Sequence, residues 1–252
     1  MTQVSTQAEL QAAIAAQEAD IEVTADFQID AGQRITYAAK ISSGAGGPYT
    51  MTKADGHEGT LFLIENRGSL TLSNIILDGA KETHSGTSTT GSLIWVPTGT
   101  LILDTGAVLQ NNRTVQGGGI SCNGETSPIN IIMRGNAAIR DNVAYTGGGI
   151  YVFFTGESSL QISDQARIEN NECTGYGGGI CHNGRPQNTL LMSGEAVIAN
   201  NRARNGGGIY VYDSGCTISG STELSDNQAT EKGGGIYFVG TGLQIDDGVK
   251  IQ

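Results

Sequence analysis

The sequence IRDNVAYTGGGI, residues 139–150, recurs along the chain with nearly constant spacing. In each copy an aliphatic residue stands three positions before an Asn, and a glycine triplet followed by Ile comes five or six positions after that Asn. Five copies are present, and the Ile residues that follow the triplets are 30, 30, 29 and 27 positions apart: Ile120, Ile150, Ile180, Ile209 and Ile236. A period of this length indicates a repeat protein in which each copy is one stacked unit.

Each unit contains three short apolar segments separated by turn residues, which is typical of three short strands. In one unit these segments lie around Ile150, at residues 160–162 and around Ile168. None of them could bury its apolar face alone, whereas stacked units share one continuous core. Helical repeats are excluded because no unit shows a 3.6-residue period over a dozen residues. The sequence therefore predicts an all-β fold, a right-handed, single-stranded parallel β-helix with three strands per coil.

The repeated Gly and Asn residues have structural roles in such a coil. Glycines adopt positive φ and let neighbouring coils approach where a Cβ would clash. An Asn at the same place in every coil can bond through its amide to the amides above and below and to the turn backbone. Both motifs are therefore interpreted as architectural.

A helix is expected before the first coil. Thr6 followed by Glu9 forms a capping box, and the apolar residues after it share one helical face, Leu10, Ala13 and Ile14. We predict that residues 6–16 form a capping helix that covers the open end of the first coil.

The chain is predicted to be a single β-helix domain, residues 1–252. Residues 21–108 contain strand-like segments without glycine triplets and are predicted to form irregular N-terminal coils, whereas residues 109–252 form the regular coils. Because the sequence stops inside a unit, we expect the natural protein to continue beyond it.

Charge and composition restrict the partners. The formal net charge is −11. Because proteins that bind nucleic acids or anionic membranes carry an excess of Lys and Arg, we expect neither as a partner. No run of about 18 apolar residues is present, so we expect no membrane-spanning segment. No secretion signal follows Met1. From the predicted fold we nevertheless expect an extracellular or cell-surface monomer whose signal and anchor lie outside this sequence.

The paired signature resembles the repeats of the polymorphic outer-membrane protein family of bacterial surface proteins. That family's pattern is Gly-Gly-Ala-Ile with Phe-x-x-Asn; here a third Gly replaces the Ala, and Ile or Leu replaces the Phe, as in residues 139–142. The resemblance covers residues 109–236, and the opening of the chain is similar to pectin-lyase-like β-helices. The resemblance to the polymorphic outer-membrane protein repeats implies a secreted, surface-displayed adhesin or passenger domain. Because the shared motifs are architectural, this resemblance assigns no catalytic residue.

The Cys and His residues form no recognisable chemical site. Cys173 takes a position held mostly by Ala and Cys216 one held by Leu, so both are expected to be buried. Cys122 and Cys181 lie two coils apart, roughly 10 Å, which exceeds the reach of a disulfide. No Cys-x-x-Cys or His pair supports zinc, and the three His residues stand in unrelated contexts. We expect four free thiols, no metal and no cofactor.

A polysaccharide lyase or glycoside hydrolase is the alternative from a different class. Such an enzyme needs clustered carboxylates around calcium with a basic residue, or a pair of catalytic carboxylates. Asp246 and Asp247 are the only adjacent acidic pair, and the register of the pair points to a turn. We therefore expect no catalytic residue in this chain.

The strand after each glycine triplet carries aromatic residues. Since the Ile points inward, the next residue and the one two positions beyond it should face outward. Stacking would gather five of these side chains into one exposed stripe: Tyr151, Phe153, Tyr210, Tyr212 and Tyr237. Tyr145 and Tyr176 stand in the adjoining turns. Exposed amphipathic rings suit stacking on sugars or packing at protein interfaces, whereas Tyr is also a good strand former anywhere.

These observations predict an adhesin-type domain that binds a glycan or a host surface protein along the aromatic strand face. Two alternatives stay open, namely the carbohydrate-active enzyme and a passive stalk that displays another domain.

Overall fold

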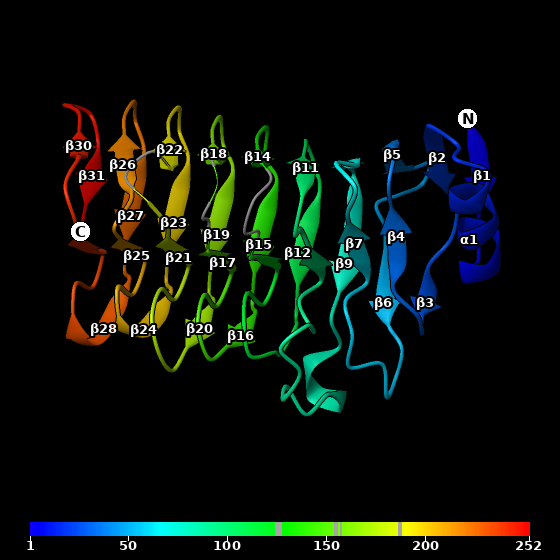
Figure 1. Cartoon of the computed structure of the whole chain (residues 1–252), viewed down its shortest axis with the longest axis horizontal. Coiled ribbons are helices and arrows are strands. Elements are labelled where there is room, and N and C mark those ends of the chain that lie inside the picture. The colour runs from blue at the N-terminus through cyan, green and yellow to red at the C-terminus, as the bar shows by residue number, and fades with distance from the viewer. Residues whose placement is uncertain (124–127, 154–155, 157, 186–187) are drawn as a thin grey trace.

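The computed structural model describes residues 1–123, 128–153, 156, 158–185 and 188–252. Within these residues the chain winds into a stack of coils along one axis, with the N-terminus at one end and the C-terminus at the other (Figure 1). The strands pair in parallel with strands of the neighbouring coils, in three long sheets and one short sheet. The predicted all-β parallel β-helix with three strands per coil is confirmed.

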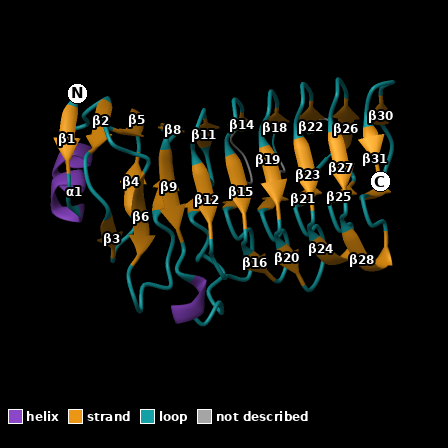
Figure 2. Ribbon diagram, turned by 180° about the vertical axis from the view of Figure 1, so that it is seen from behind, coloured by secondary structure: helices purple, strands orange, loops and turns teal. Residues whose placement is uncertain are grey.

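The three long sheets run the length of the stack, and Figure 2 shows the strands of sheet B side by side. Sheet A contains, in order, β1 (Thr2–Val4), β2 (Asp20–Val23), β5 (Ala38–Ser43), β8 (Ser69–Ser73), β11 (Gly99–Leu103), β14 (Ile129–Met133), β18 (Ser159–Ile162), β22 (Thr189–Met192), β26 (Gly215–Ile218) and β30 (Leu243–Ile245). Sheet B contains β3 (Phe27–Ile29), β6 (Tyr49–Lys53), β9 (Ile75–Asp78), β12 (Val108–Gln110), β15 (Ala138–Arg140), β19 (Arg167–Glu169), β23 (Val197–Ala199), β27 (Glu223–Ser225) and β31 (Lys250–Ile251). Sheet C contains β4 (Gln33–Ile35), β7 (Phe62–Ile64), β10 (Ile94–Trp95), β13 (Ile120–Cys122), β17 (Ile150–Phe153), β21 (Ile180–Asn183), β25 (Ile209–Tyr212) and β29 (Ile236–Val239).

A fourth, short sheet was not predicted. Sheet D contains β16 (Val143–Ala144), β20 (Glu172–Cys173), β24 (Arg202–Asn205) and β28 (Gln228–Lys232). Its strands follow the repeated Asn and point one small residue inward in each coil, for example Ala144 and Cys173. Because such a short segment buries a single small side chain, it produces no apolar pattern in the sequence.

The first helix, α1 (Gln7–Ala15), lies at the N-terminal end of the stack, as Figure 1 shows. The Thr6 hydroxyl accepts a hydrogen bond from the backbone N–H of Glu9 (3.3 Å), and the Glu9 carboxylate accepts one from the N–H of Ser5 (2.6 Å). The capping bonds are thus present, although Glu9 reaches Ser5 rather than Thr6. Leu10 and Ala13 are buried in the same hydrophobic cluster as the first coils. A short 3₁₀ helix, η1 (Lys81–Thr83), lies in a segment that projects beyond the other turns (Figure 2).

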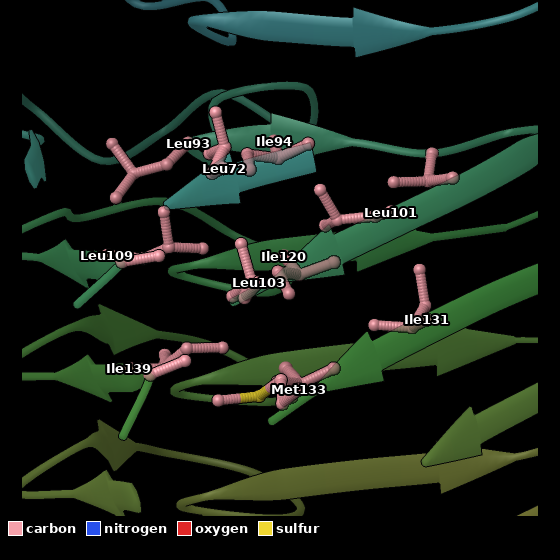
Figure 3. Close-up of a cluster of buried hydrophobic side chains, with 14 of the residues drawn as sticks. Leu72, Leu93, Ile94, Leu101, Leu103, Leu109, Ile120, Ile131, Met133 and Ile139 are labelled. Atoms are coloured by element: carbon pink, nitrogen blue, oxygen red, sulfur yellow. The ribbon is translucent and has the colours of Figure 1, made fainter. Parts of the chain in front are cut away.

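The core is built from columns of inward side chains. Strand register places Leu101 beside Ile131, and Leu103 beside Met133. Side chains at equivalent strand positions therefore stack on one another from coil to coil (Figure 3). All four of these residues are fully buried. Alternate residues of each strand face inward, as the pleat requires.

The repeated Asn residues form a continuous ladder inside the stack, as predicted. The Nδ2 of Asn142 donates to the Oδ1 of Asn171 (3.1 Å), and Asn171 repeats this bond to Asn201 (3.0 Å). Asn201 donates in the same way to Asn227 (3.0 Å). Each of these Nδ2 groups also donates to a backbone carbonyl, that of Ile139 in the case of Asn171 (3.0 Å). The ladder satisfies buried polar groups and holds successive coils in one register.

The glycine triplets let adjacent coils touch. The first glycine of each triplet has positive φ, for example +63° at Gly147. At the second, a Cβ on Gly178 would lie 2.3 Å from the carbonyl oxygen of Gly207 in the next coil and 2.7 Å from that of Arg202. A side chain at this position would therefore have to separate the coils.

Candidate binding site

The outward residue after each buried Ile forms one row across sheet C. The register of the strands aligns six side chains from successive coils: Trp95, Ser121, Tyr151, Cys181, Tyr210 and Tyr237. We call this set the first row. Its four aromatic residues are partly exposed, whereas Ser121 and Cys181 are only 2% and 3% exposed. The two small residues lie on the predicted outward face but are covered, since each has a large aromatic neighbour in both adjoining coils.

A second row runs parallel to the first, two positions further along each strand. It aligns Phe153, Asn183, Tyr212 and Val239. Phe153 is 38% exposed and Tyr212 is 46% exposed. The second row therefore presents the more accessible rings, as expected for residues near the ends of their strands.

A third group of side chains comes from the residues that precede the glycine triplets. Gly177 has φ +71° and turns the chain sharply just before strand β21 of sheet C. Tyr176, which precedes this turn, contacts Tyr210 of the next coil. The two ring centroids are 4.7 Å apart and the planes are tilted by 47°. Tyr210 in turn lies 5.6 Å from Tyr237. The ammonium of Lys232 is 5.6 Å from the Tyr237 ring centroid, which fits a cation–π contact.

Several of these side chains line a shallow surface depression with a volume of about 320 Å³, which we call the tyrosine depression. It is lined by Gln116, Thr146, Tyr151, Tyr176, Cys181, Asn183, Tyr210 and Tyr212. None of these residues is an acid, a Lys or an Arg, although the chain as a whole has a net charge of −11. The lining combines ring faces with amide and hydroxyl groups.

Burial raises the pKa values of two phenols in the depression. Burial, reinforced by Cys181 and the neighbouring tyrosines, raises the pKa of Tyr210 to about 12. The pKa of Tyr151 is also raised, mainly by burial and further by Cys181. Both hydroxyls therefore stay neutral at physiological pH, where each is able to donate and accept hydrogen bonds.

Three of the five predicted binding residues, Tyr151, Tyr210 and Tyr212, line the depression. Phe153 lies beside them in the second row and Tyr237 stacks against Tyr210 on the C-terminal side, so the structure places the predicted stripe on one face. Whether these residues bind a ligand stays a prediction.

The sequence reasoning missed Trp95 and did not foresee the contact that Tyr176 makes. Trp95 precedes Ser121 in the first row, and its Nε1 donates to Asn123 Oδ1 (2.7 Å), which orients the indole. Aligning Gly-Ser-Leu-Ile, residues 91–94, with the Gly-Gly-Gly-Ile of the next coil would have located Trp95. Tyr176 was placed in a turn beside the stripe, and only the three-dimensional corner shows that it packs on Tyr210.

Two of the other depressions of similar volume differ from it in chemistry. One, about 360 Å³, lies on sheet D between Glu172, Arg202 and Arg204. The other, about 380 Å³, lies on the sheet B face and includes Arg167 and Glu195. Both mix opposite charges, and none of the residues that line them is aromatic. The tyrosine depression is therefore the strongest candidate for ligand contact.

The four Cys side chains and His182 are buried. All four Cys side chains are buried free thiols, as predicted, and burial raises their pKa values, that of Cys173 to about 11. Burial lowers the pKa of His182 to about 4, and its Nδ1 lies 2.8 Å from the Ser214 hydroxyl inside the solenoid. Across the described ranges, no three His, Cys, Asp or Glu side chains come together as a metal site would require. In that same part of the chain, no helix is long and apolar enough to cross a membrane.

Comparison with known families matches one repeat. The model described as the Chlamydia polymorphic membrane protein (Chlamydia_PMP) repeat matches residues 221–239. This segment contains the last copy of the paired signature, with Leu224, Asn227 and Ile236. No characterised protein and no solved structure matches the chain. The similarity to pectin-lyase-like β-helices stays a prediction, and this chain is similar to the Chlamydia polymorphic membrane protein repeat over that one copy.

Proposed function

We propose that this chain is a non-catalytic, adhesin-type β-solenoid domain displayed on a bacterial cell surface, and that it binds a glycan or a host surface protein through sheet C. The carrying observation is the cluster of Tyr176, Tyr210 and Tyr237 beside the tyrosine depression. Ring faces gathered on a solvent-facing sheet are costly unless they meet a partner. The repeat match at residues 221–239 supports the surface location, since it is to a membrane-protein repeat.

Cell binding tests this proposal. The purified domain carrying a fluorescent label should bind to epithelial cells in a saturable way, measured by flow cytometry. The double variant Tyr176→Ala/Tyr210→Ala should bind about thirtyfold more weakly, since two ring contacts of roughly 1 kcal/mol each are lost.

The matched control is Leu191→Ala, because Leu191 is 38% exposed on the outer face of sheet A, away from the tyrosines. This variant should bind like the unmodified domain. Equal binding by all three proteins would remove the aromatic face from the proposed function. Release of unsaturated or reducing sugars from pectin or alginate by the purified domain would contradict its non-catalytic part.

A further inference from the structure

We infer that the aromatic face of sheet C binds an extended, uncharged glycan chain that lies along the solenoid axis and stacks on rings in alternate coils. This inference rests on the proposed function and names the chemistry of its ligand. Three features of the face carry it, namely the spacing of the rings in the first row, the polar groups between them, and the lack of charge.

The first row alternates large and small side chains. Trp95, Tyr151 and Tyr210 are separated by Ser121 and Cys181, which are covered. Since neighbouring parallel strands lie about 4.8 Å apart, the aromatic positions recur at roughly 9.6 Å along the axis. The row therefore presents ring platforms with a period of two coils.

Crowding does not force this alternation. Tyr210 and Tyr237 occupy adjacent coils of the same row, and their ring centroids are 5.6 Å apart. Aromatic residues in neighbouring coils are thus compatible with the fold. The small residues at positions 121 and 181 separate the platforms by one coil, and Cys181 lines the tyrosine depression.

A two-coil period suits a polysaccharide with equatorial linkages. In such an extended chain each sugar is turned over relative to the one before, so that the same ring face recurs at every second sugar. The length of two such pyranose units is close to two coil spacings. The apolar C–H face of a sugar packs on an aromatic ring, while its hydroxyls point sideways. A chain lying along the axis would bring equivalent sugar faces over Trp95, Tyr151 and Tyr210.

The groups between the platforms match sugar hydroxyls. Gln116, Thr146 and Asn183 line the depression with amide and hydroxyl groups that both donate and accept hydrogen bonds. The Tyr210 hydroxyl is held neutral by its raised pKa, so it also does both. Direct hydrogen bonding of this kind gives orientation to a ligand that stacks on rings.

The charges near the face favour an uncharged chain. Carboxylate or sulfate groups on a glycan are bound mainly by Arg and Lys. The lining of the depression contains neither. Nearby, Arg204 is paired with Glu231 (2.7 Å), and Lys232 lies beyond the depression, over Tyr237. In a chain of net charge −11, an acidic glycan in the depression would therefore contact no Lys or Arg of its lining.

The single tryptophan makes this inference directly testable. Because Trp95 is the only Trp in the chain, its fluorescence reports on a ligand that reaches the N-terminal end of the row. The full chain is titrated with cello-, xylo-, manno- and chito-oligosaccharides of two to eight sugars, with fluorescence and calorimetry as readouts. Oligogalacturonates and hyaluronan oligosaccharides of the same lengths serve as acidic counterparts.

At least one uncharged series should bind, with an affinity about tenfold higher for six sugars than for two, because only the longer chain spans several platforms. Trp95 fluorescence should change with the long members alone. Tyr210→Ala should weaken binding about tenfold, whereas Tyr210→Phe keeps the ring and should bind within about threefold of the unmodified chain. Leu191→Ala should have no effect.

Preferential binding of the acidic series, affinity independent of length, or an unchanged Trp95 signal on binding would each overturn the inference. If no oligosaccharide binds while cell binding still depends on Tyr176 and Tyr210, the partner is a protein and only the proposed function stands. If the Tyr176→Ala/Tyr210→Ala variant binds cells as well as the unmodified domain and no oligosaccharide binds, both the proposed function and this inference are wrong.

Discussion

Replacing Asn171 by Ala should destabilise the solenoid far more than its small size suggests. Four hydrogen bonds of the buried ladder depend on its side chain. Its Oδ1 accepts from the backbone N–H and from the Nδ2 of Asn142 (both 3.1 Å), and its Nδ2 donates to the Ile139 carbonyl and to Asn201 Oδ1 (both 3.0 Å). At about 1 kcal/mol net for each buried bond, the loss in the free energy of unfolding is about 4 kcal/mol.

Urea denaturation followed by far-UV circular dichroism measures this loss, and hydrogen exchange locates it. The backbone N–H of Asn142 donates directly to Asn171 Oδ1, so its exchange should accelerate in the variant. The matched control is Asn130→Ala, since the Asn130 side chain is exposed and accepts a hydrogen bond from the exposed Ser159 hydroxyl. That change should cost less than about 0.5 kcal/mol. If Asn171→Ala cost no more than Asn130→Ala, or if Asn142 kept its protection, the ladder would not be a stabilising element and the reasoning would be refuted.

Three further changes test the interior of the stack. His182 has a folded pKa of about 4 against 6.5 in the unfolded chain, so unfolding takes up a proton as the pH falls from 6.5 to 4, and about 3 kcal/mol should be lost in that window. Denaturation at several pH values should show this slope in the unmodified chain and not in His182→Val. Lys53 has a folded pKa of about 8 against 10.5, so its own contribution to stability should rise by about 3 kcal/mol as the pH increases between these values. The unmodified chain should therefore gain about that much relative to Lys53→Met at equal ionic strength, because the buried Cys thiols, whose pKa values are raised, destabilise both proteins equally in this window. Gly178→Ala, whose Cβ would meet backbone atoms of the next coil, should lower the free energy of unfolding by about 3 kcal/mol. Gly235→Ala, whose Cβ would meet only the Ile251 side chain at 3.0 Å, should cost about 1 kcal/mol or less by the same measurement.

Much of the fold could be predicted because the coils repeat. A column position such as Ile150 meets the same type of residue above and below, so apolar residues recur at that position from coil to coil. The Asn and glycine motifs were readable for the same reason. Sheet D escaped prediction because its strands bury only one small side chain per coil, as at Ala144. The hydrogen bond from the Lys53 ammonium to Asn112 Oδ1 (3.0 Å) also escaped prediction, since the two residues are 59 positions apart and Lys53 belongs to no repeated pattern.

The site was less predictable than the fold. Alternation within a strand was enough to place Tyr151 and Tyr212 on the outer face. It could not show that Cys181 would be covered, because burial on an outer row depends on the size of the neighbours in adjacent coils. Nor could it show the contact of Tyr176 with Tyr210, which depends on how sharply Gly177 turns the chain between two sheets.

The Asn ladder packs against the glycines that precede the aromatic strands of sheet C. A Cβ on Gly149 would lie 3.2 Å from Asn171 Nδ2, so the ladder packs directly behind the corner from which Tyr151 is projected. Each coil is therefore held against its neighbour at the point where sheet C begins. A row of rings on separate loops would vary in spacing by the motion of those loops, whereas rings projected from this corner inherit the strand spacing of about 4.8 Å. Such a fixed period is of use only to a ligand that is itself periodic, and this is the physical reason for looking to an extended, repeating chain as the partner of this face.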